Sequence, residues 1–262
     1  MILKTERKRP DSWAEFRARS KSRWLAPFLA LDWCGEWTAY WLSGWALLEV
    51  LEYLQTLSLL LVVVLYFTDA GNRLKQKHYQ AWQVINTAQG KGGNGGRIDA
   101  LEELLEDGVS LTGVDLENAY LAGVDLHGAE LTRSSFHGTD IRNSDFHRAN
   151  LTDSDLAWAN LRHSNLSNCQ LHDVDLKNAD LHSANLTQAD LTGSDCTGAD
   201  FRNTNLIGIG WQGIKSIKLA NVYGVVNPPP GFLDWAKSAG AVSIESDEDW
   251  AAQTSKAESN SK

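Results

Sequence analysis

The sequence predicts a mainly β fold, a solenoid of five-residue repeats, with an α-helical membrane region before it and helical caps at its ends. Three observations in the 262-residue chain lead to this expectation. Residues 111–206 repeat a five-residue pattern. Residues 53–68 form an uncharged apolar run behind a cluster of tryptophans. Residues 90–96 contain five glycines between two short helical patterns.

The five-residue pattern is strict. Every fifth residue from Leu111 to Leu206 is Leu, Phe, Ile or Cys, at twenty successive positions. A small residue stands two positions before each of them, and the residue between is mostly Asp or Asn. A period of five fits neither an α-helix nor an extended strand, so the chain must turn every five residues, with the large and the small residue pointing inward. The predicted solenoid core therefore includes Leu111, Leu131, Leu151, Leu161, Leu171, Leu181, Leu191, Phe136, Phe146 and Phe201.

Four such pentapeptides per coil would enclose a square interior filled by large and small side chains. Twenty pentapeptides then give about five coils, which would stack to a height of roughly 24 Å at the spacing of paired strands. Unpaired edges at both ends need covers, so we expect a helix over 98–107 at the first coil and a cap over 231–241 at the last. The motif returns one residue late at Ala220-Asn-Val222, which predicts a register change after Leu206.

Composition and charge exclude several classes of function. The net charge is −9, and residues 109–207 carry fourteen acidic against six basic side chains, which argues against a nucleic-acid binder. Cys34, Cys169 and Cys196 cannot form a closed disulfide framework and lack the spacing of a zinc or redox site. A filled interior leaves no pocket for a catalytic pair. We therefore expect no enzyme activity, no metal, no cofactor and no small-molecule substrate.

The N-terminal region is typical of a membrane segment. The sixteen uncharged residues 53–68 span only about 24 Å as a helix, less than the hydrocarbon core of roughly 30 Å. An extension back to residue 46 reaches the needed length but includes Glu49 and Glu52. A buried helix of a soluble protein is the alternative, whereas a signal peptide fits badly because its apolar stretch begins closer to the N-terminus. Tryptophan recurs at every fourth position ahead of the run, as in an interfacial belt, at Trp33, Trp37, Trp41 and Trp45.

Basic residues flank this region on both sides. Residues 1–23 carry eight Lys or Arg, and Arg73, Lys75 and Lys77 follow the apolar run. The positive-inside rule assigns both flanks to the cytoplasm. Both can lie there only if residues 24–67 enter and leave on one side, as a hairpin or as an interfacial helix followed by a re-entrant one. A single pass would satisfy only one flank.

Six segments follow from these patterns. The glycine-rich stretch 90–96 predicts a flexible connector, and Gly96-Arg97 stands where a phosphate loop has Lys followed by Ser or Thr. The segments are a basic N-terminal segment over 1–23, a Trp-rich interfacial or transmembrane helical region over 24–68, an amphipathic helix, linker and cap helix over 69–108, the repeats over 109–224, a C-terminal cap over 225–241 and a disordered tail over 242–262.

The repeat Ala-[Asp/Asn]-Leu-x-x, present at Ala179-Asp-Leu181, Ala184-Asn-Leu186 and Ala189-Asp-Leu191, resembles that of the pentapeptide-repeat proteins. The resemblance covers about 100 residues and implies a right-handed quadrilateral β-helix. The Trp-rich leader, the glycine connector and the ending Gly231-Phe-Leu-Asp-Trp235 also resemble membrane-tethered members common in cyanobacteria. This implies attachment to a plasma or thylakoid membrane, with the repeats in the cytoplasm.

Residues twenty apart should share a face, so the outward positions form columns. One column reads Ala122, Arg142, Arg162, His182 and Arg202, and beside it run Tyr120, Asp140, Asn160, Asp180 and Asp200. This arrangement is either a ladder of exposed ion pairs, each worth about 0–1 kcal/mol, or a basic stripe that docks an acidic partner. Trp158 also points outward and is a candidate contact anchor.

These features favour a membrane-anchored scaffold that presents an acidic β-helical surface for protein–protein interaction. Two alternatives stay open. Some pentapeptide-repeat proteins inhibit gyrase as acidic DNA mimics, although the membrane segment and the short stack argue against that role. The other is an accessory subunit of a membrane transporter or complex that uses Glu49 and Glu52, because carboxylates at membrane depth are costly and usually functional.

Overall fold

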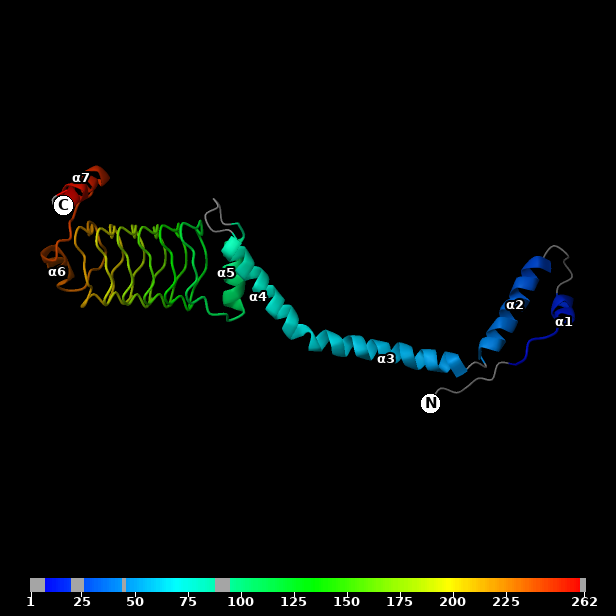
Figure 1. Cartoon of the computed structure of the whole chain (residues 1–262). Coiled ribbons are helices and arrows are strands. Elements are labelled where there is room, and N and C mark those ends of the chain that lie inside the picture. Colours follow the sequence, from blue (N-terminus) through cyan, green and yellow to red (C-terminus); the bar gives the residue numbers. More distant parts are fainter. Residues whose placement is uncertain (1–7, 20–25, 44–45, 88–94, 260–262) are drawn as a thin grey trace. The chain divides into compact units, whose positions relative to one another are not determined.

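The structure, a computed structural model, describes residues 8–19, 26–43, 46–87 and 95–259. The chain folds as two compact units, Met1–Arg73 and Leu74–Lys262 (Figure 1). The division falls inside α4 (Ala70–Thr87), a little after the predicted boundary at residue 68. The reason lies in packing, because Ala81 and Ile85 of α4 are buried in the core of the second unit.

The first unit contains α1 (Trp13–Ala18), α2 (Ala26–Ser43) and α3 (Ala46–Thr68), and α1 packs on α2. Ser12 begins α1, and its backbone N–H and its hydroxyl both donate to the Glu15 carboxylate. Trp33 of α2 donates its indole N–H to the Asp11 carbonyl at 2.9 Å, and its ring centroid lies 5.6 Å from that of Trp13. Part of the predicted tryptophan face therefore packs against α1.

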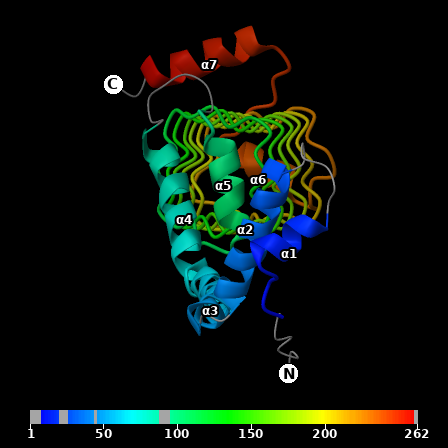
Figure 2. The same cartoon turned by 90° about the vertical axis from the view of Figure 1, so that its right-hand side faces the viewer.

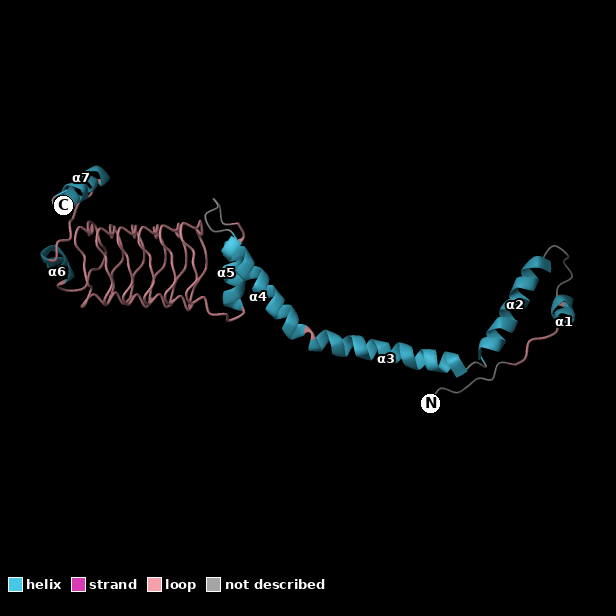
Figure 3. Cartoon of the chain, in the orientation of Figure 1, coloured by secondary structure: helices cyan, strands magenta, loops and turns pink. Residues whose placement is uncertain are grey.

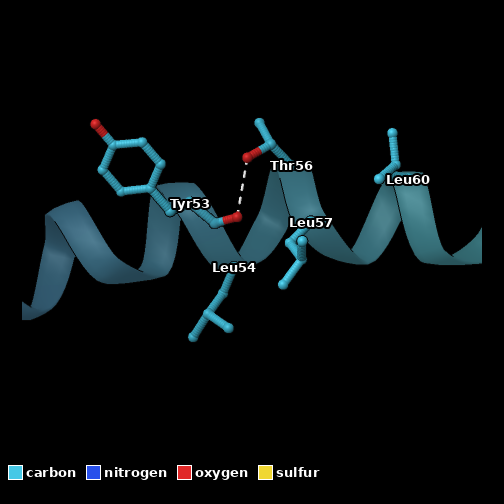
Figure 4. Close-up of a pocket in the computed structure, with 5 residues that line it drawn as sticks. All are labelled: Tyr53, Leu54, Thr56, Leu57 and Leu60. Atoms are coloured by element: carbon cyan, nitrogen blue, oxygen red, sulfur yellow. Dashed lines mark hydrogen bonds between the residues drawn. The ribbon is translucent and has the colours of Figure 1, made fainter.

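The apolar run lies on α3, and its side chains from Tyr53 to Phe67 are largely exposed. Tyr53, Leu54, Thr56, Leu57 and Leu60 line a shallow groove along one side of this helix (Figure 4). The Thr56 hydroxyl donates to the Tyr53 carbonyl at 2.9 Å, so this polar group is satisfied within the helix. Among the described residues no single helix is both long and apolar enough to cross a membrane, and only the pair Tyr53–Thr68 and Gly71–Thr87, bent by 43°, qualifies on length and composition.

The repeats of the second unit form a stack of coils (Figure 1). Parallel β-bridges join residues twenty apart, such as Asp140 with Asn160 and Asn160 with Asp180, so each coil holds four pentapeptides as predicted. Between residues 95 and 259 these are isolated bridges, and the coils are drawn without strands (Figure 3). Backbone hydrogen bonds connect neighbouring coils, for example from the Leu161 N–H to the Asp180 carbonyl at 2.7 Å. The main chain is thus satisfied from coil to coil.

Each pentapeptide contains a tight turn. The N–H of the small residue donates to the carbonyl of the large residue three positions earlier, as from Ala119 to Leu116 at 3.0 Å. The third residue of the turn has a positive φ, which type II turns require and which favours glycine and asparagine. Gly128 and Asn118 occupy such positions. This demand explains why Gly or Asn is frequent two positions after the large residue, a regularity that the predicted pattern did not include.

The predicted core is confirmed, because all ten named Leu and Phe residues have 0% or 1% exposure. Phe136 and Phe146 meet edge to face, with ring centroids 5.9 Å apart. Where Ser or Thr replaces the small Ala, its hydroxyl donates to a carbonyl of the preceding coil, as from Thr139 to Leu116 at 2.7 Å and from Ser164 to Ile141 at 2.7 Å. The buried hydroxyls are therefore satisfied rather than costly.

The register change after Leu206 is also confirmed. Asp190 pairs with Gly210 twenty residues on, whereas Asp195 pairs with Ser216 and Asp200 with Asn221, each twenty-one residues on. Asn221 pairs in turn with Val242. The stack therefore continues beyond the five coils expected from residues 111–206, because the displaced motif adds further rungs.

Helices cover both ends of the coils (Figure 2). α5 (Arg97–Glu106) lies over the first coil, where Leu101 and Leu104 are fully buried. α6 (Phe232–Ser238) lies over the last coil, where the Trp211 ring is 5.9 Å from Phe232 and 5.1 Å from Trp235. The two caps match the helix expected over 98–107 and the cap expected over 231–241.

The C-terminal segment differs from its prediction. The sequence predicts a disordered tail over 242–262, whereas the structure has a helix, α7 (Asp247–Ser259). Acidic residues in its first turn favour this helix start, since they complement the helix dipole. The indole N–H of Trp250 donates to the Leu219 carbonyl at 3.1 Å and holds the helix on the coils. Long-range contacts with the coils, of which this is one, thus override the polar composition.

Candidate functional site

The candidate site is the basic column, defined as Arg142, Arg162, His182 and Arg202 on one face of the coils. Each of these residues is positioned by the Asp or Asn two places before it. The side-chain oxygen of that residue accepts the backbone N–H, as Asp180 does from His182 at 3.0 Å and Asp200 from Arg202 at 2.9 Å. These short-range bonds fix the turn that carries the functional side chain. The sequence shows that Asp or Asn recurs at these positions, but it did not predict that their side chains accept the backbone N–H two positions later.

Arg142 and Arg162 have the properties of an exposed ion-pair ladder. The Arg142 guanidinium lies 3.1 Å from the Asp140 carboxylate and donates to the Tyr120 hydroxyl at 2.8 Å. The Arg162 guanidinium lies 3.3 Å from the Asp180 carboxylate in the next coil. The two arginine side chains remain 43% and 42% exposed. Their charge is therefore paired within the chain and still accessible to a partner.

His182 occupies the next rung of the basic column. Its Nε2 lies 3.4 Å from the Asn203 amide, and its ring centroid lies 6.4 Å from that of His163. Within the described part of the chain its buried Nδ1 has no hydrogen-bond partner. The imidazoles of His163 and His182 therefore lie near each other on neighbouring coils, and His163 directly follows Arg162 in the sequence.

Arg202 differs from the others and is not exposed to a partner, contrary to the expectation of a continuous stripe. It has 8% exposure, and its guanidinium donates three hydrogen bonds to the Asp200 carboxylate, from Nε to Oδ1 at 2.9 Å, from Nε to Oδ2 at 3.1 Å and from Nη2 to Oδ2 at 2.6 Å. The hydrogen bond to Asp200 is the main reason why the pKa of Arg202 lies above its ordinary value, with a smaller contribution from Asp247. The C-terminal segment covers this end of the column, so its accessible part consists of Arg142, Arg162 and His182.

Trp158 projects outward as predicted and is 62% exposed. It stands two places after the buried Leu156, so it belongs to a different column from the arginines. Its φ is +62°, which is unfavourable for a bulky side chain. The next-coil residue at the same place is Asn178, with a φ of +56°. The repeat therefore holds Trp158 in a strained turn and leaves its ring uncovered. Backbone strain of this kind is concentrated at functional sites, which fits a contact role for Trp158.

The predicted membrane-interface residues divide into three groups. Trp33 and Trp37 are half-buried, and the Arg9 guanidinium lies 5.7 Å from the centroid of the Trp37 ring. Trp41 is 67% exposed. Trp45 lies outside the described residues, as do the side chains of Glu49 and Glu52. The role of this surface and of the two carboxylates stays a prediction.

The cysteines allow a direct test of the inward assignment. Cys169 and Cys196 are buried, and burial raises the pKa of the Cys169 thiol to about 12. Cys34 is exposed on α2. We expect iodoacetamide at pH 8 to modify Cys34 in the folded chain and to leave the other two thiols unmodified, because only thiolates react. Mass spectrometry before and after unfolding in urea would measure this, and rapid modification of Cys169 in the folded chain would contradict the core assignment.

Comparisons with known proteins agree with the repeat pattern. The family model described as Pentapeptide repeat region matches residues 109–186 and 129–215. A comparison with curated proteins returns no match. Among solved structures, the chain is similar to a pentapeptide repeat protein of the Arabidopsis thaliana thylakoid lumen, at 32% identity, with 36% of this chain and 66% of that chain covered and a TM-score of 0.36.

Two further solved structures are similar to the chain. One is a pentapeptide repeat protein from Nostoc PCC 7120, at 25% identity, with 56% of this chain and 94% of that chain covered and a TM-score of 0.32. The other is the pentapeptide repeat protein Rfr23 from the cyanobacterium Cyanothece 51142, at 20% identity, with 56% and 99% covered and a TM-score of 0.30. The family model thus identifies a pentapeptide repeat region within residues 109–215 of the chain.

Proposed function

We propose that the chain is a membrane-anchored scaffold whose repeats present a column-ordered, acidic surface to protein partners and perform no catalysis. In this proposal the coils form a right-handed quadrilateral β-helix on the cytoplasmic side of the membrane. One observation carries the proposal: the inward Leu and Phe positions are filled to 0–1% exposure. A filled interior offers no cleft for a substrate, so the chemistry of the coils lies in their outward columns. Such long, regular surfaces suit the binding of other proteins.

The exposed apolar side chains of α3 support the membrane anchor. Leu59, Leu61 and Val62 are 70%, 56% and 62% exposed, and their neighbours around the helix are exposed as well. A helix that is apolar on all sides needs an apolar environment. The hydroxyl groups of Ser58 and Thr68 donate to carbonyls of the same helix at 2.8 and 3.0 Å, which lowers the cost of placing them in lipid.

We expect the full-length chain to remain in the pellet when membranes are washed with alkaline carbonate. Replacement of both Leu61 and Val64 by Arg should release it, because each charge in an apolar run adds about 2.5–3.5 kcal/mol to the cost of insertion. Replacement of the same two residues by Ala is the matched control and should leave the chain in the pellet. Release of the unaltered chain by the wash, or equal retention of the Arg and Ala variants, would contradict the anchor.

We also expect the accessible part of the basic column to be needed for partner binding. The double change Arg142→Gln and Arg162→Gln should leave the melting temperature nearly unaltered, since exposed ion pairs contribute about 0–1 kcal/mol each. The same change should abolish a salt-sensitive interaction, because charge complementarity acts on association more than on folding. The measurement is the set of proteins that co-purify with the solubilised chain at low and at moderate salt.

The control for this experiment removes the same charge elsewhere. Arg133 and Arg148 are exposed turn residues outside the basic column. The double change Arg133→Gln and Arg148→Gln therefore alters net charge equally and should leave the co-purifying proteins unaltered. Identical partners for the unaltered chain and for both double variants at both salt concentrations would contradict a role of the column in docking.

A further inference from the structure

The C-terminal strap, defined as residues 242–250, pairs through its backbone with the last coil and so continues the stack on the face of the basic column. Val242 pairs with Asn221, and the Val222 N–H donates to the Val242 carbonyl at 2.8 Å. The fully buried Asn221 side chain then bonds both backbone groups of Ile244. Its amide donates to the Ile244 carbonyl at 2.7 Å, and its oxygen accepts the Ile244 N–H at 3.1 Å. The strap is thus held in an extended, peptide-like conformation beside the column.

Beyond Ile244 the strap brings three different groups to the guanidinium of Arg202. The Glu245 carbonyl accepts from Nη1 at 3.0 Å, and the Asp247 carboxylate lies 2.5 Å from the same nitrogen. The ring of Trp250 lies 5.3 Å from the guanidinium carbon, within the range of a cation–π contact. A backbone oxygen, a carboxylate and an aromatic ring are three kinds of group that a guanidinium binds. We call Arg202, Asp200 and Asn221 the Arg202 site.

Side chains around the Arg202 site add contacts to the strap. The Tyr223 hydroxyl donates to the Glu245 carboxylate, and this bond raises the pKa of Tyr223. The Trp250 indole N–H is bonded to the Leu219 carbonyl. The strap is therefore recognised through its backbone, its acidic groups and one tryptophan, as a bound peptide would be.

Little else holds this part of the chain. Asp247 remains 81% exposed, and residues 251–253 of α7 are exposed as well. Trp250 is thus the principal aromatic contact of α7 with the coils among the described residues. A segment attached through so few side chains can leave its site without unfolding the repeats. Its tether keeps it at a high effective concentration, so a competitor in solution is excluded while the strap is intact.

We propose that the Arg202 site is a binding site for acidic peptide segments that carry tryptophan, occupied in cis by Glu245–Trp250 and entered by a partner's segment of the same chemistry when α7 is displaced. This inference deepens the proposed scaffold function and rests on it for the existence of a protein partner. The chain itself supplies the evidence for the partner's chemistry, since the strap shows which groups the site accepts.

The test uses a fluorescent synthetic peptide with the sequence of residues 243–254 and the full-length chain. The unaltered chain should bind the peptide weakly, because its own strap fills the site. The variant Asp247→Asn with Trp250→Ala should bind it at least about tenfold more tightly, because both changes weaken the internal competitor. Fluorescence anisotropy at two salt concentrations measures both, and binding to the variant should weaken at the higher salt. Equal binding by the two chains, or no binding by the variant, overturns the inference.

Changes in the peptide provide the control that cannot disturb the fold of the chain. A peptide with Asp247→Asn or with Trp250→Ala should bind the strap-released variant at least about tenfold less tightly, since each removes a contact to Arg202. Addition of Arg133→Gln to that variant should leave binding unaltered, because Arg133 lies outside both the basic column and the strap contacts. Equal affinity for all three peptides overturns the inference, even if the peptide binds.

The outcomes separate this inference from the proposed function. Partner capture that depends on Arg142 and Arg162, together with failure of the peptide to bind, overturns the Arg202 site and leaves the scaffold. Peptide binding at Arg202 without any co-purifying partner overturns the docking role of the basic column and leaves the peptide site. Circular dichroism melts of each variant confirm that the coils are folded in every comparison.

Discussion

Leu161→Ala should lower the free energy of unfolding by about 2–5 kcal/mol, through lost burial and the cavity that remains. Leu161 has 0% exposure and lies in a coil bonded to the next one through its own N–H. The neighbouring coils cannot move inward to fill the cavity, because the backbone of each coil is fixed by hydrogen bonds to the coils beside it. Urea unfolding followed by circular dichroism measures the change.

Two further variants define the inward and outward positions. Leu161→Lys should disrupt the stack, because an ammonium group in a filled interior has no partner. Thr152→Ala should change the unfolding free energy by less than about 1 kcal/mol, because Thr152 faces outward and its bond to Asn150 can be replaced by water. Equal melting temperatures for Leu161→Ala and Thr152→Ala would contradict the assignment of the core.

The repeat could be predicted from the sequence because each pentapeptide meets its structural demands locally. Inward Leu, small residue and turn residue all lie within five positions, so a single sequence contains the pattern twenty times. The displaced motif at Ala220-Asn-Val222 marks the register change for the same reason. The bonds of the buried hydroxyls could not be predicted so directly. Ser164 reaches the Ile141 carbonyl twenty-three residues earlier, and that distance is fixed only by the coil geometry.

The candidate site was less predictable, because burial there depends on a remote segment. Arg142, Arg162 and Arg202 occupy equivalent positions of the repeat, and each follows an Asp or Asn by two residues. They differ because Glu245 and Asp247, more than forty residues after Arg202, fold back onto it alone. The strap has no periodic pattern, and its polar, acidic composition is typical of a disordered tail. Trp250, the one large aromatic residue among residues 242–262, was the sequence feature that indicated a contact of this segment with the coils.

The burial of Arg202 leads to the second large expected effect. Arg202→Met should lower the free energy of unfolding by about 3–5 kcal/mol, since it leaves the Asp200 carboxylate buried without its cation. The side chains of Arg202 and Asp200 are only 9% and 5% exposed, so water cannot replace the lost partner. Arg142→Met, the same change at the equivalent exposed position, should cost less than about 1 kcal/mol. Urea unfolding of both variants, monitored by circular dichroism, measures the difference.

A second change identifies the cause. Asp200→Asn keeps the oxygen that accepts the Arg202 N–H but removes the buried negative charge. In the Arg202→Met background it should therefore restore part of the lost stability, whereas in the unaltered chain it should destabilise, because it leaves Arg202 without a buried anion. This opposite sign distinguishes an uncompensated charge from simple loss of packing. If Asp200→Asn destabilised both backgrounds equally, the pair would contribute through contacts alone, and the difference between Arg202 and Arg142 would need another cause.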